Sequence, residues 1–430
     1  MMIDNVLKNR EKEGEIIKVG MVGAGATGRA IALQLGTPAP GIRLVALANR
    51  TVKNGERALI EAGINDYVKV DNVQKAEDTI FRKKTVLTEN PQVLTECSNI
   101  DVIVEVTGTV EFASNIVLSA IDNGKNIILV NAELDSFLGP ILKKKADQAG
   151  VVITNTDGDE PGVAMTLLRY LRTAGLKPVA AGNLKGMVDH YRTPETQRAF
   201  AEKYDQDVRK VTSFADSTKL SMEATVLANA TGFQVGQRGM FGPKCDYVRE
   251  IANLLPADKM LASGLIDYAL GAAPHTGAFV IVHEKSSLKM AQLAYYKLGD
   301  GPFYVFYTPY HLPHIQIASS IGRAQLFKDP TVTPINGPVC EVLTVAKSDL
   351  RAGTKLDGVG GFSAYGLIDN YLEARKANAL PISFSDGCIL KKDVKKDDIV
   401  TFDHVEMPKD QIINRLWNEQ CEMWPYKEKK

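Results

Sequence analysis

Short apolar runs alternate with longer amphipathic stretches through the first third of the chain. The pattern predicts helices such as residues 29–35 and 112–123 between runs that have the length of strands. These runs comprise residues 16–22, 42–48, 100–107, 127–130 and 151–154. Strands alternating with helices predict a parallel sheet covered on both faces, so we expect a Rossmann-type α/β domain over residues 1–155.

Beyond this domain the pattern loosens and predicts two further domains. Longer helical and extended runs indicate an α+β domain over residues 156–336. These runs comprise residues 163–173, 219–230, 277–283 and 301–308. Short β-like runs at 341–346 and 399–402, set among turn-rich segments, predict a small β-rich domain over residues 337–430.

The composition is that of a globular protein. Of the 430 residues 45% are hydrophobic, and 51 basic side chains balance 51 acidic ones, so no net field attracts nucleic acid or an anionic membrane. The N-terminus lacks the apolar core of a signal peptide, and no run reaches the roughly 20 apolar residues of a membrane span. We expect a cytoplasmic homo-oligomer that acts on a small-molecule substrate, with neither a nucleic-acid nor a membrane partner.

A glycine motif follows the first predicted strand and precedes the first predicted helix. Gly23-Ala-Gly25-Ala26-Thr27-Gly28 matches G-x-G-x-x-G, the turn that holds the pyrophosphate of a dinucleotide at a helix N-terminus. The alternative is a glycine turn without a ligand. The position between strand and helix favours dinucleotide binding.

The end of the second strand indicates which dinucleotide binds. An NAD site usually carries Asp or Glu there, whereas this chain has Asn49-Arg50-Thr51. A guanidinium pairs with a 2′-phosphate, so Arg50 favours NADP(H) over NAD(H). The alternative is that Arg50 is a solvated loop residue that stacks on adenine.

Further polar residues follow two other strands of the predicted sheet. Thr107, Gly108 and Asn131 stand where an open parallel sheet presents ligands, and we expect them near the ribose and nicotinamide. Glu133 has two interpretations of equal weight: a cofactor contact, or a carboxylate that favours a helix N-terminus.

These motifs resemble the nucleotide domain of homoserine dehydrogenases. The resemblance rests on residues 22–28, 101–108 and 124–131, and it continues more weakly at Leu184-Lys-Gly-Met187 and Asp216-Ser-Thr-Lys219. Glu133 stands where that family has lysine, and the Asp-to-Lys spacing is three rather than four. These departures argue against an amino-acid substrate.

Over nearly the whole chain the sequence resembles the SAF-domain oxidoreductases, a homoserine-dehydrogenase-like family that includes 1-deoxy-D-xylulose 5-phosphate reductoisomerase-like enzymes. The matching segments are residues 157–162, 184–186, 216–219, 310–312, 341–350 and 389–398, the last two resembling a SAF domain. The resemblance implies a catalytic second domain and a SAF-like third domain.

Hydride transfer at a carbinol needs a group that handles the hydroxyl proton, and a desolvated lysine is suited to this. Lys219 is the first candidate. It shares a helix face with Glu223, and the resemblance implies that Asp216 orients the substrate or the lysine. The alternative is an exposed ion pair between Lys219 and Glu223.

Three other candidates lie in loops. Lys185 follows a predicted strand and would bind substrate or stabilise an enolate or alkoxide. His311 follows an aromatic run and is either a site residue or a satisfied core histidine. Arg192 suits a phosphate or carboxylate of the substrate.

Asp157, Asp159 and Glu160 form a carboxylate cluster after the last sheet strand. They are candidates for substrate binding through a divalent cation that chelates a hydroxy-ketone. The competing interpretation is that Asp159 caps a helix whose first turn contains Pro161.

Together these features predict an NADP(H)-dependent oxidoreductase or reductoisomerase acting on a small polyhydroxylated carbonyl compound, phosphorylated or not. A homoserine dehydrogenase is the first alternative. A catalytically inactive NAD(P)-sensing protein is the second, and the presence of both Lys185 and Lys219 argues against it.

Overall fold

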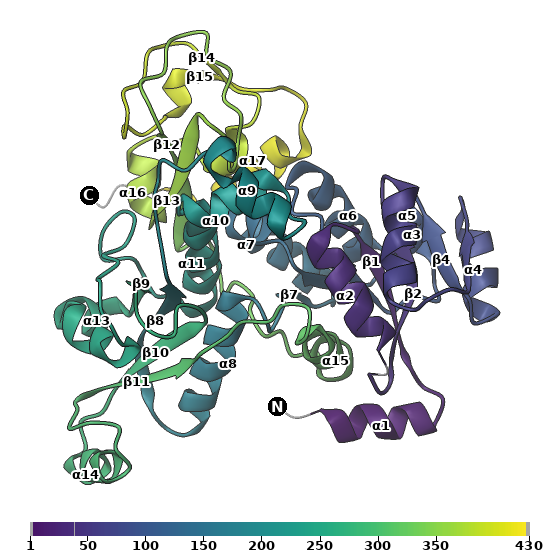
Figure 1. The fold of residues 1–430 in the computed structure, drawn as a ribbon, viewed down its shortest axis with the longest axis horizontal. Coiled ribbons are helices and arrows are strands. Elements are labelled where there is room, and N and C mark those ends of the chain that lie inside the picture. Colours follow the sequence, from purple (N-terminus) through teal and green to yellow (C-terminus); the bar gives the residue numbers. More distant parts are fainter. Residues whose placement is uncertain (1–2, 38, 427–430) are drawn as a thin grey trace. The chain divides into compact units, whose positions relative to one another are not determined.

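A computed structural model describes residues 3–37 and 39–426 of the chain. The chain divides into two compact units (Figure 1). Unit 1 comprises Met1–Asp159, Leu312–Thr333 and Ile412–Trp417, and unit 2 comprises Glu160–His311, Pro334–Gln411 and Asn418–Lys430. The division into three consecutive domains at the expected residues stays a prediction.

Unit 1 is built on a parallel sheet of seven strands in the order β3-β4-β2-β1-β5-β6-β7. The strands are β1 (Ile17–Val22), β2 (Ile42–Ala48), β3 (Tyr67–Lys69), β4 (Thr85–Thr88), β5 (Val102–Glu105), β6 (Asn126–Leu129) and β7 (Ile153–Asn155). The strand order reverses at β1, because β2 lies on one side of it and β5 on the other. Such a switch point opens a crevice at the carboxyl ends of the two strands, where dinucleotides bind.

Helices connect these strands and complete a Rossmann-type unit, which confirms the predicted fold class. They are α2 (Ala26–Gly36), α3 (Val52–Glu61), α4 (Val73–Phe81), α5 (Gln92–Glu96), α6 (Glu111–Asp122) and α7 (Ala132–Ala149). The strands β3 and β4 are not among the predicted ones, since each offers only two or three apolar residues to the pattern.

Two helices from distant parts of the sequence complete the core of unit 1. Ile3, directly before helix α1 (Asp4–Lys12), and Leu7 within it belong to the buried cluster, and α15 (Ile317–Phe327) contributes Ile317 and Ile321. A Cβ atom on Gly322 would lie 2.4 Å from Ile3, so glycine permits the close approach of α15 to α1. The first residues of α17 (Ile412–Met423) also belong here, with the Glu111 carboxylate accepting from the backbone of Ile412.

A buried ion pair fastens α15 to the end of the sheet. Asp157 lies shortly after β7 and accepts from Ser319, Ser320 and Thr331. Arg323 Nη1 lies 3.3 Å from Asp157 Oδ2, and both side chains are 5% exposed. Arg323 also pairs with Asp329 at 2.9 Å. Asp157 therefore holds residues 312–333 on unit 1.

Unit 2 is built on a mixed four-stranded sheet in the order β11-β10-β8-β9. Its strands are β8 (Lys177–Lys185), β9 (Leu265–Leu270), β10 (Ala278–His283) and β11 (Phe303–Thr308), with β8 and β9 parallel and the other pairs antiparallel. The helices of this part are α8 (Glu160–Thr173), α9 (Pro194–Lys203), α10 (Val208–Ala215), α11 (Thr218–Thr231), α12 (Ile251–Leu254), α13 (Ala257–Ser263) and α14 (Ser287–Tyr295). This mixture matches the expected α+β composition.

The remainder of unit 2 holds two small antiparallel pairs. They are β12 (Cys340–Ala346) with β13 (Ala364–Asn370), and β14 (Ile389–Leu390) with β15 (Val405–Glu406); α16 (Tyr371–Lys376) follows β13. In place of the strand expected at 399–402, Ile399 and Thr401 form isolated bridges before a 3₁₀ turn at Phe402–His404.

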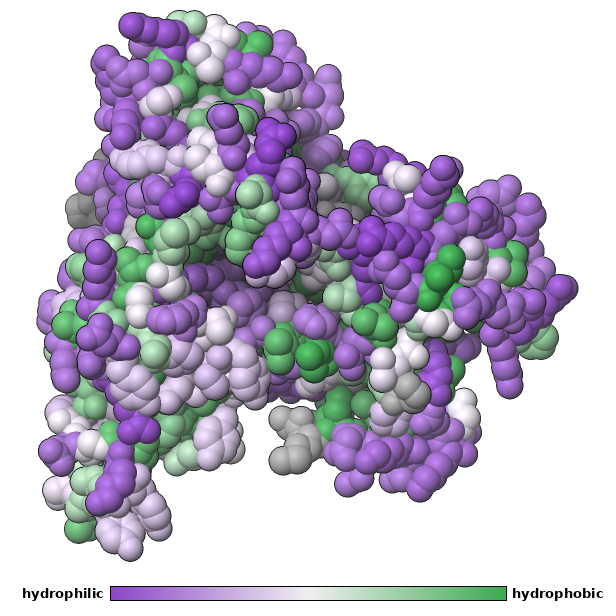
Figure 2. Space-filling model, in the orientation of Figure 1, coloured by the Kyte–Doolittle hydropathy of each residue, from purple (hydrophilic) through white to green (hydrophobic). Residues whose placement is uncertain are grey.

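Hydrophilic residues predominate on the visible face of the molecule, with apolar residues scattered among them (Figure 2). In the part of the chain that the structure describes, no helix combines the length and the apolar character needed to cross a membrane.

Replacing Asp157 by alanine is expected to lower the free energy of unfolding by about 3 kcal/mol or more, because Arg323 would lose a buried partner. Chemical denaturation monitored by circular dichroism measures the change. Asp71→Ala, which breaks an exposed pair with Lys75, is the matched control and is expected to change little. Equal effects of the two substitutions would contradict the anchoring role of Asp157.

Candidate functional site

The glycine loop of unit 1 has the geometry of an anion-binding turn. Gly23 adopts a φ of +115°, and an added Cβ would lie 3.1 Å from the backbone of Val106, so two features require glycine. Gly25 faces open space. No side chain of the described residues caps α2, so the amide groups of Ala26, Thr27 and Gly28 at its N-terminus suit a phosphate.

The two residues that follow β2 have different roles. The Asn49 side chain accepts from Ala24 N at 3.0 Å and donates to Thr51 O at 2.8 Å, which braces the glycine loop against β2. Arg50 is exposed, and among the described residues no ion pair is recorded for it. Its guanidinium is therefore accessible, and its binding of a 2′-phosphate stays a prediction.

The carboxyl ends of β5 and β6 are joined by a buried glutamate. Glu105 Oε1 accepts from the amide and the hydroxyl of Thr107, and Glu105 Oε2 accepts from Asn131 Nδ2 at 2.7 Å. Asn131 also donates to Thr109 O and accepts from Leu134 N, so it ties β5, β6 and the start of α7 together. Burial raises the pKa of Glu105 to about 7, even though its three donors lower it.

Glu133 lies in the first turn of α7 and is buried. Its charge raises the pKa of Glu105. A carboxylate in the first turn is favoured by the helix dipole, so the helix-starting interpretation accounts for Glu133. Its role as a cofactor contact stays a prediction.

In unit 2 a lysine lies between two buried glutamates. Lys185 Nζ, at the end of β8, is 2.6 Å from Glu160 Oε1 and 3.2 Å from Glu223 Oε2. Glu160 begins α8, Glu223 lies in α11, and their side chains are only 5% and 4% exposed. Asn183, two residues before Lys185 on the same strand face, donates to Glu223 Oε2 at 2.9 Å. We call Lys185, Glu160 and Glu223 the lysine centre.

The charged groups of the lysine centre stabilise one another in their ionised forms. Burial raises the pKa of Glu160, but Lys185 and His311 outweigh it and lower the pKa to about 2. Burial lowers the pKa of Lys185, but Glu160 and Glu223 outweigh it and raise that pKa above its ordinary value. Lys185 is therefore a fixed cation, suited to stabilising negative charge rather than to accepting a proton.

A histidine reaches the same glutamate. His311 Nε2 lies 3.4 Å from Glu160 Oε2, and His311 Nδ1 lies 3.0 Å from Thr276 Oγ1. The His311 side chain is 30% exposed, so it has access to solvent as well as to Glu160. The structure thus brings together Lys185, Glu160, Glu223 and His311, four of the residues selected from the sequence.

Asp216 has another partner than the one expected. Its Oδ2 lies 2.8 Å from Lys347 Nζ, and its Oδ1 accepts from Thr218 N at the start of α11. Burial raises the pKa of Asp216 although Lys347 opposes the shift. Asp216 therefore positions α11, the helix that carries Lys219 and Glu223.

The remaining predicted residues of unit 2 lie outside the lysine centre. Lys219 is half-buried in the first turn of α11. Arg192 pairs with Asp189 at 3.0 Å, and its carbonyl oxygen accepts from Lys347. Glu223 contacts Lys185 and Asn183, and its expected pairing with Lys219 on the face of α11 stays a prediction.

The three clustered carboxylates separate in function. Asp157 is surrounded by the donors that hold α15, which gives it a structural role and leaves little room for a ligand. Glu160 belongs to the lysine centre. Asp159 directly precedes α8 and is buried, so both capping and ligand binding stay predictions for it.

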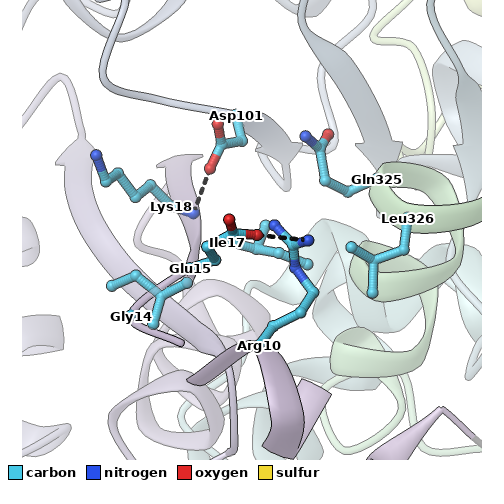
Figure 3. A pocket seen from close by; sticks show the side chains of 9 residues that line it. Arg10, Gly14, Glu15, Ile17, Lys18, Asp101, Gln325 and Leu326 are labelled. Carbon is cyan, nitrogen blue, oxygen red and sulfur yellow. Dashed lines mark hydrogen bonds and ion pairs between the residues drawn. The ribbon is translucent and has the colours of Figure 1, made fainter. Parts of the chain in front are cut away.

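Two cavities have different relations to these residues. A cavity of about 580 Å³ in unit 2 is lined by Gly186, which directly follows Lys185 in sequence, and by Met187, Lys244, Cys245 and Leu270. A cavity of about 390 Å³ in unit 1 lies at the start of β1, where Lys18 N donates to Asp101 (Figure 3). The second cavity is at the amino ends of the strands, away from the edge where such sheets bind ligands.

Sequence reasoning missed three residues that support the candidate site: Glu105, Asn183 and Lys347. Glu105 stands inside an apolar run. The hydrophobic pattern there predicts a buried strand and does not show whether its one carboxylate has a function. Asn183 and Lys347 have partners 40 and 131 residues away. The one indication in the sequence was that Asn183 and Lys185, two residues apart, lie on the same face of an extended strand.

Two protein-family models match consecutive parts of the chain. Residues 23–154 match the model described as "Homoserine dehydrogenase, NAD binding domain". Residues 158–317 match the model described as "Oxidoreductase DRL, catalytic domain". The chain therefore carries a homoserine-dehydrogenase-like NAD-binding domain followed by an oxidoreductase catalytic domain, and the predicted resemblance of the nucleotide domain is confirmed. No curated protein matches the chain in sequence.

Solved structures with a similar chain course include three oxidoreductases. An NAD binding oxidoreductase from Klebsiella pneumoniae is 16% identical over 40% of this chain and 43% of its own, with a TM-score of 0.29. Myo-inositol dehydrogenase from Lactobacillus casei is 15% identical over 69% of this chain and 75% of its own, with a TM-score of 0.38. DOX-P reductoisomerase is 14% identical over 50% of this chain and 58% of its own, with a TM-score of 0.33. The chain thus spans less than two thirds of the first and third of these proteins.

Lys185→Met is expected to reverse the pH dependence that Glu160 gives to stability. In the wild type the lowered pKa of Glu160 stabilises the fold above about pH 4.5 and is lost as the pH falls toward about 2. Without the ammonium, burial would raise the pKa of Glu160, so stability would fall as the pH rises above about 4.5. Thermal unfolding of the variant at acidic and alkaline pH measures this. Lys177→Met, at the exposed start of β8, is the control; a parallel pH dependence of both variants would contradict the role of Lys185.

Proposed function

We propose that this protein is an NADP(H)-dependent reductase or reductoisomerase of a small polyhydroxylated carbonyl compound, phosphorylated or not. The observation that carries the proposal is the lysine centre, a protonated ammonium held by two buried glutamates at the end of a strand. Cofactor binding is assigned to unit 1 and substrate binding to unit 2. The cavity lined by Gly186 and Met187 has a volume suited to a small molecule.

The preference for NADP(H) is supported by charge at the end of β2. Arg50 is exposed, and no carboxylate stands beside it in Asn49-Arg50-Thr51 to repel a 2′-phosphate. The uncapped amide groups of α2 would hold the pyrophosphate. When bound, the nicotinamide supplies the hydride.

The residues of unit 2 supply the charge that reduction of a carbonyl requires. As a carbonyl carbon gains a hydride, its oxygen becomes negative, and Lys185 offers a fixed cation for that oxygen. His311 is partly exposed and lies beside Glu160, so it is placed to pass a proton between solvent and substrate. Asn183 keeps Glu223 in position beneath the ammonium.

A divalent cation fits the donor set of the lysine centre. Carboxylate oxygens of Glu160 and Glu223 lie within 4.8 Å of one another, and both side chains are buried. Two carboxylates around one ammonium leave an excess of negative charge when both are ionised. Hard cations such as Mg²⁺ prefer such oxygen ligands, and a hydroxy-ketone would complete the coordination.

The SAF-like character of residues 337–430, the homo-oligomeric state and the cytoplasmic location also remain proposals.

Arg50→Asp is expected to weaken NADPH binding by about ten-fold to a hundred-fold, because a charged hydrogen-bond partner is replaced by a repelling one. NADH binding is expected to change much less. Fluorescence titration with both nucleotides measures the two affinities, and Arg82→Asp, another exposed arginine of unit 1, is the control. An equal loss for NADH and NADPH would contradict the 2′-phosphate assignment.

Lys185→Met is expected to lower kcat by about a hundred-fold to a thousand-fold with any substrate the wild type turns over. The assay follows NADPH consumption with a panel of hydroxy-ketones and sugar phosphates, with and without Mg²⁺ or Mn²⁺. Lys219→Ala tests the other lysine, and Lys177→Met is the control. Nucleotide binding without turnover of any compound would favour the sensing protein instead.

A further inference from the structure

The carboxylate of Glu105 has an environment in which only one charge state satisfies every neighbour. Its side chain is fully buried at the end of β5, between Val22 of β1 and Leu129 of β6. An ionised glutamate only accepts hydrogen bonds, and all three groups that face its oxygens are donors. The ionised carboxylate therefore matches its surroundings, although burial disfavours it.

From Glu105 a chain of hydrogen bonds leads to the surface. The Thr107 hydroxyl donates to Glu105, so its oxygen can only accept from its other neighbours. Those neighbours include the hydroxyl of Thr109 at 2.9 Å and the amide of Thr109 at 3.3 Å. The Thr109 hydroxyl must then donate inward, which leaves the lone pairs of this exposed residue free to accept from a ligand.

Asn131 is fixed from the same carboxylate. Its two N–H groups donate to Glu105 and to Thr109 O, and its oxygen accepts from Leu134 N. The Asn131 side chain has no N–H left for a cofactor. Asn131 therefore holds the ends of β5 and β6 together. Its side chain does not donate a hydrogen bond to the cofactor, although its position at a strand end suggested a contact.

We infer that Glu105 is a positioning residue of the cofactor site, one that acts through Thr107 to orient Thr109 as a hydrogen-bond acceptor for the ribose hydroxyls of the nicotinamide nucleotide. This inference rests on the proposed function, since it requires that a nucleotide binds at the carboxyl ends of β1 and β5. Ribose hydroxyls need acceptors, and the exposed Thr109 oxygen is one that the network prepares in advance.

The charged neighbours of Glu105 bear on its pH response. Within the described residues, the charged group recorded to act on it is Glu133 of α7, and the flanking strands present Val22 and Leu129. With a pKa near 7, the ionised form prevails at alkaline pH and the protonated form at acidic pH. A protonated Glu105 releases the Thr107 hydroxyl to donate to the Thr109 oxygen, which occupies one of its lone pairs and turns the Thr109 hydrogen outward, so the acceptor at the surface is weakened as the pH falls.

Glu105→Gln tests the inference with little change in volume. A glutamine presents one NH₂ group, which must face either Asn131 Nδ2 or the Thr107 donors, so one pair of donors is forced together. We expect the Kd of NADPH to rise about ten-fold, as for loss of a hydrogen bond to a charged group. Thr107→Val should produce a similar loss, and the double variant should be no weaker than the single variants, because both act through one network.

Asp135→Asn is the matched control. Asp135 is also buried in unit 1 with its pKa raised to about 7 by burial, but its recorded partner is Asn155. An equal loss of affinity in Asp135→Asn, unchanged affinity in Glu105→Gln, or additive effects of Glu105→Gln and Thr107→Val would overturn the inference while NADPH still binds the wild type. A wild type that binds neither NADPH nor NADH would overturn the proposed function and this inference with it.

Should Glu105→Gln fail to fold, the pH dependence of NADH binding to the wild type and to Thr107→Val takes its place. NADH lacks the 2′-phosphate, whose own titration near pH 6 would otherwise contribute. Wild-type affinity is expected to fall as the pH drops through about 7, and this dependence is expected to vanish in Thr107→Val. A wild-type affinity that does not change with pH would overturn the inference.

Discussion

The ammonium of Lys185 between Glu160 and Glu223 is the interaction on which the arrangement of unit 2 depends. It joins the start of α8, the end of β8 and the middle of α11, three elements from separate parts of the sequence. A buried ion pair of this kind adds little stability by itself, but loss of any member leaves an uncompensated charge. The requirement for mutual neutralisation therefore selects one register of these elements and at the same time creates a cation at a strand end.

The two units show how the partner decides the charge of a buried carboxyl group. Glu105 and Glu160 are similarly buried, yet burial raises the pKa of Glu105 to about 7, while Lys185 and His311 hold the pKa of Glu160 at about 2. Glu105 meets only neutral donors and one like charge, whereas Glu160 meets the Lys185 ammonium and the His311 imidazole. The first carboxyl group is poised to respond to pH near neutrality, and the second stays ionised until the pH falls toward about 2.

Much of unit 1 was predictable because its signals are local. Apolar runs with helices between them predict the order of strands and helices along the chain. Gly23 and Gly25 belong to a motif in which the spacing of the glycines is set by a single tight turn. The lysine centre was predictable only in its members, since Lys185 and Glu223 were selected separately and the sequence paired Glu223 with Lys219. Pairings such as Asp216 with Lys347 depend on tertiary packing over more than a hundred residues, and no periodicity in the sequence encodes them.

The return of residues 312–333 to unit 1 bears on how the polypeptide matures during translation. Helix α15 contributes Ile317 and Ile321 to the same buried cluster as Ile3, and its Arg323 is the ion-pair partner of Asp157. While a ribosome is still producing unit 2, the nucleotide-binding sheet exposes the apolar surface that α15 will cover and leaves a carboxylate without its cation. An N-terminal fragment that ends before residue 312 would expose the same apolar surface. A nucleotide-binding fragment that folds by itself must therefore include α15.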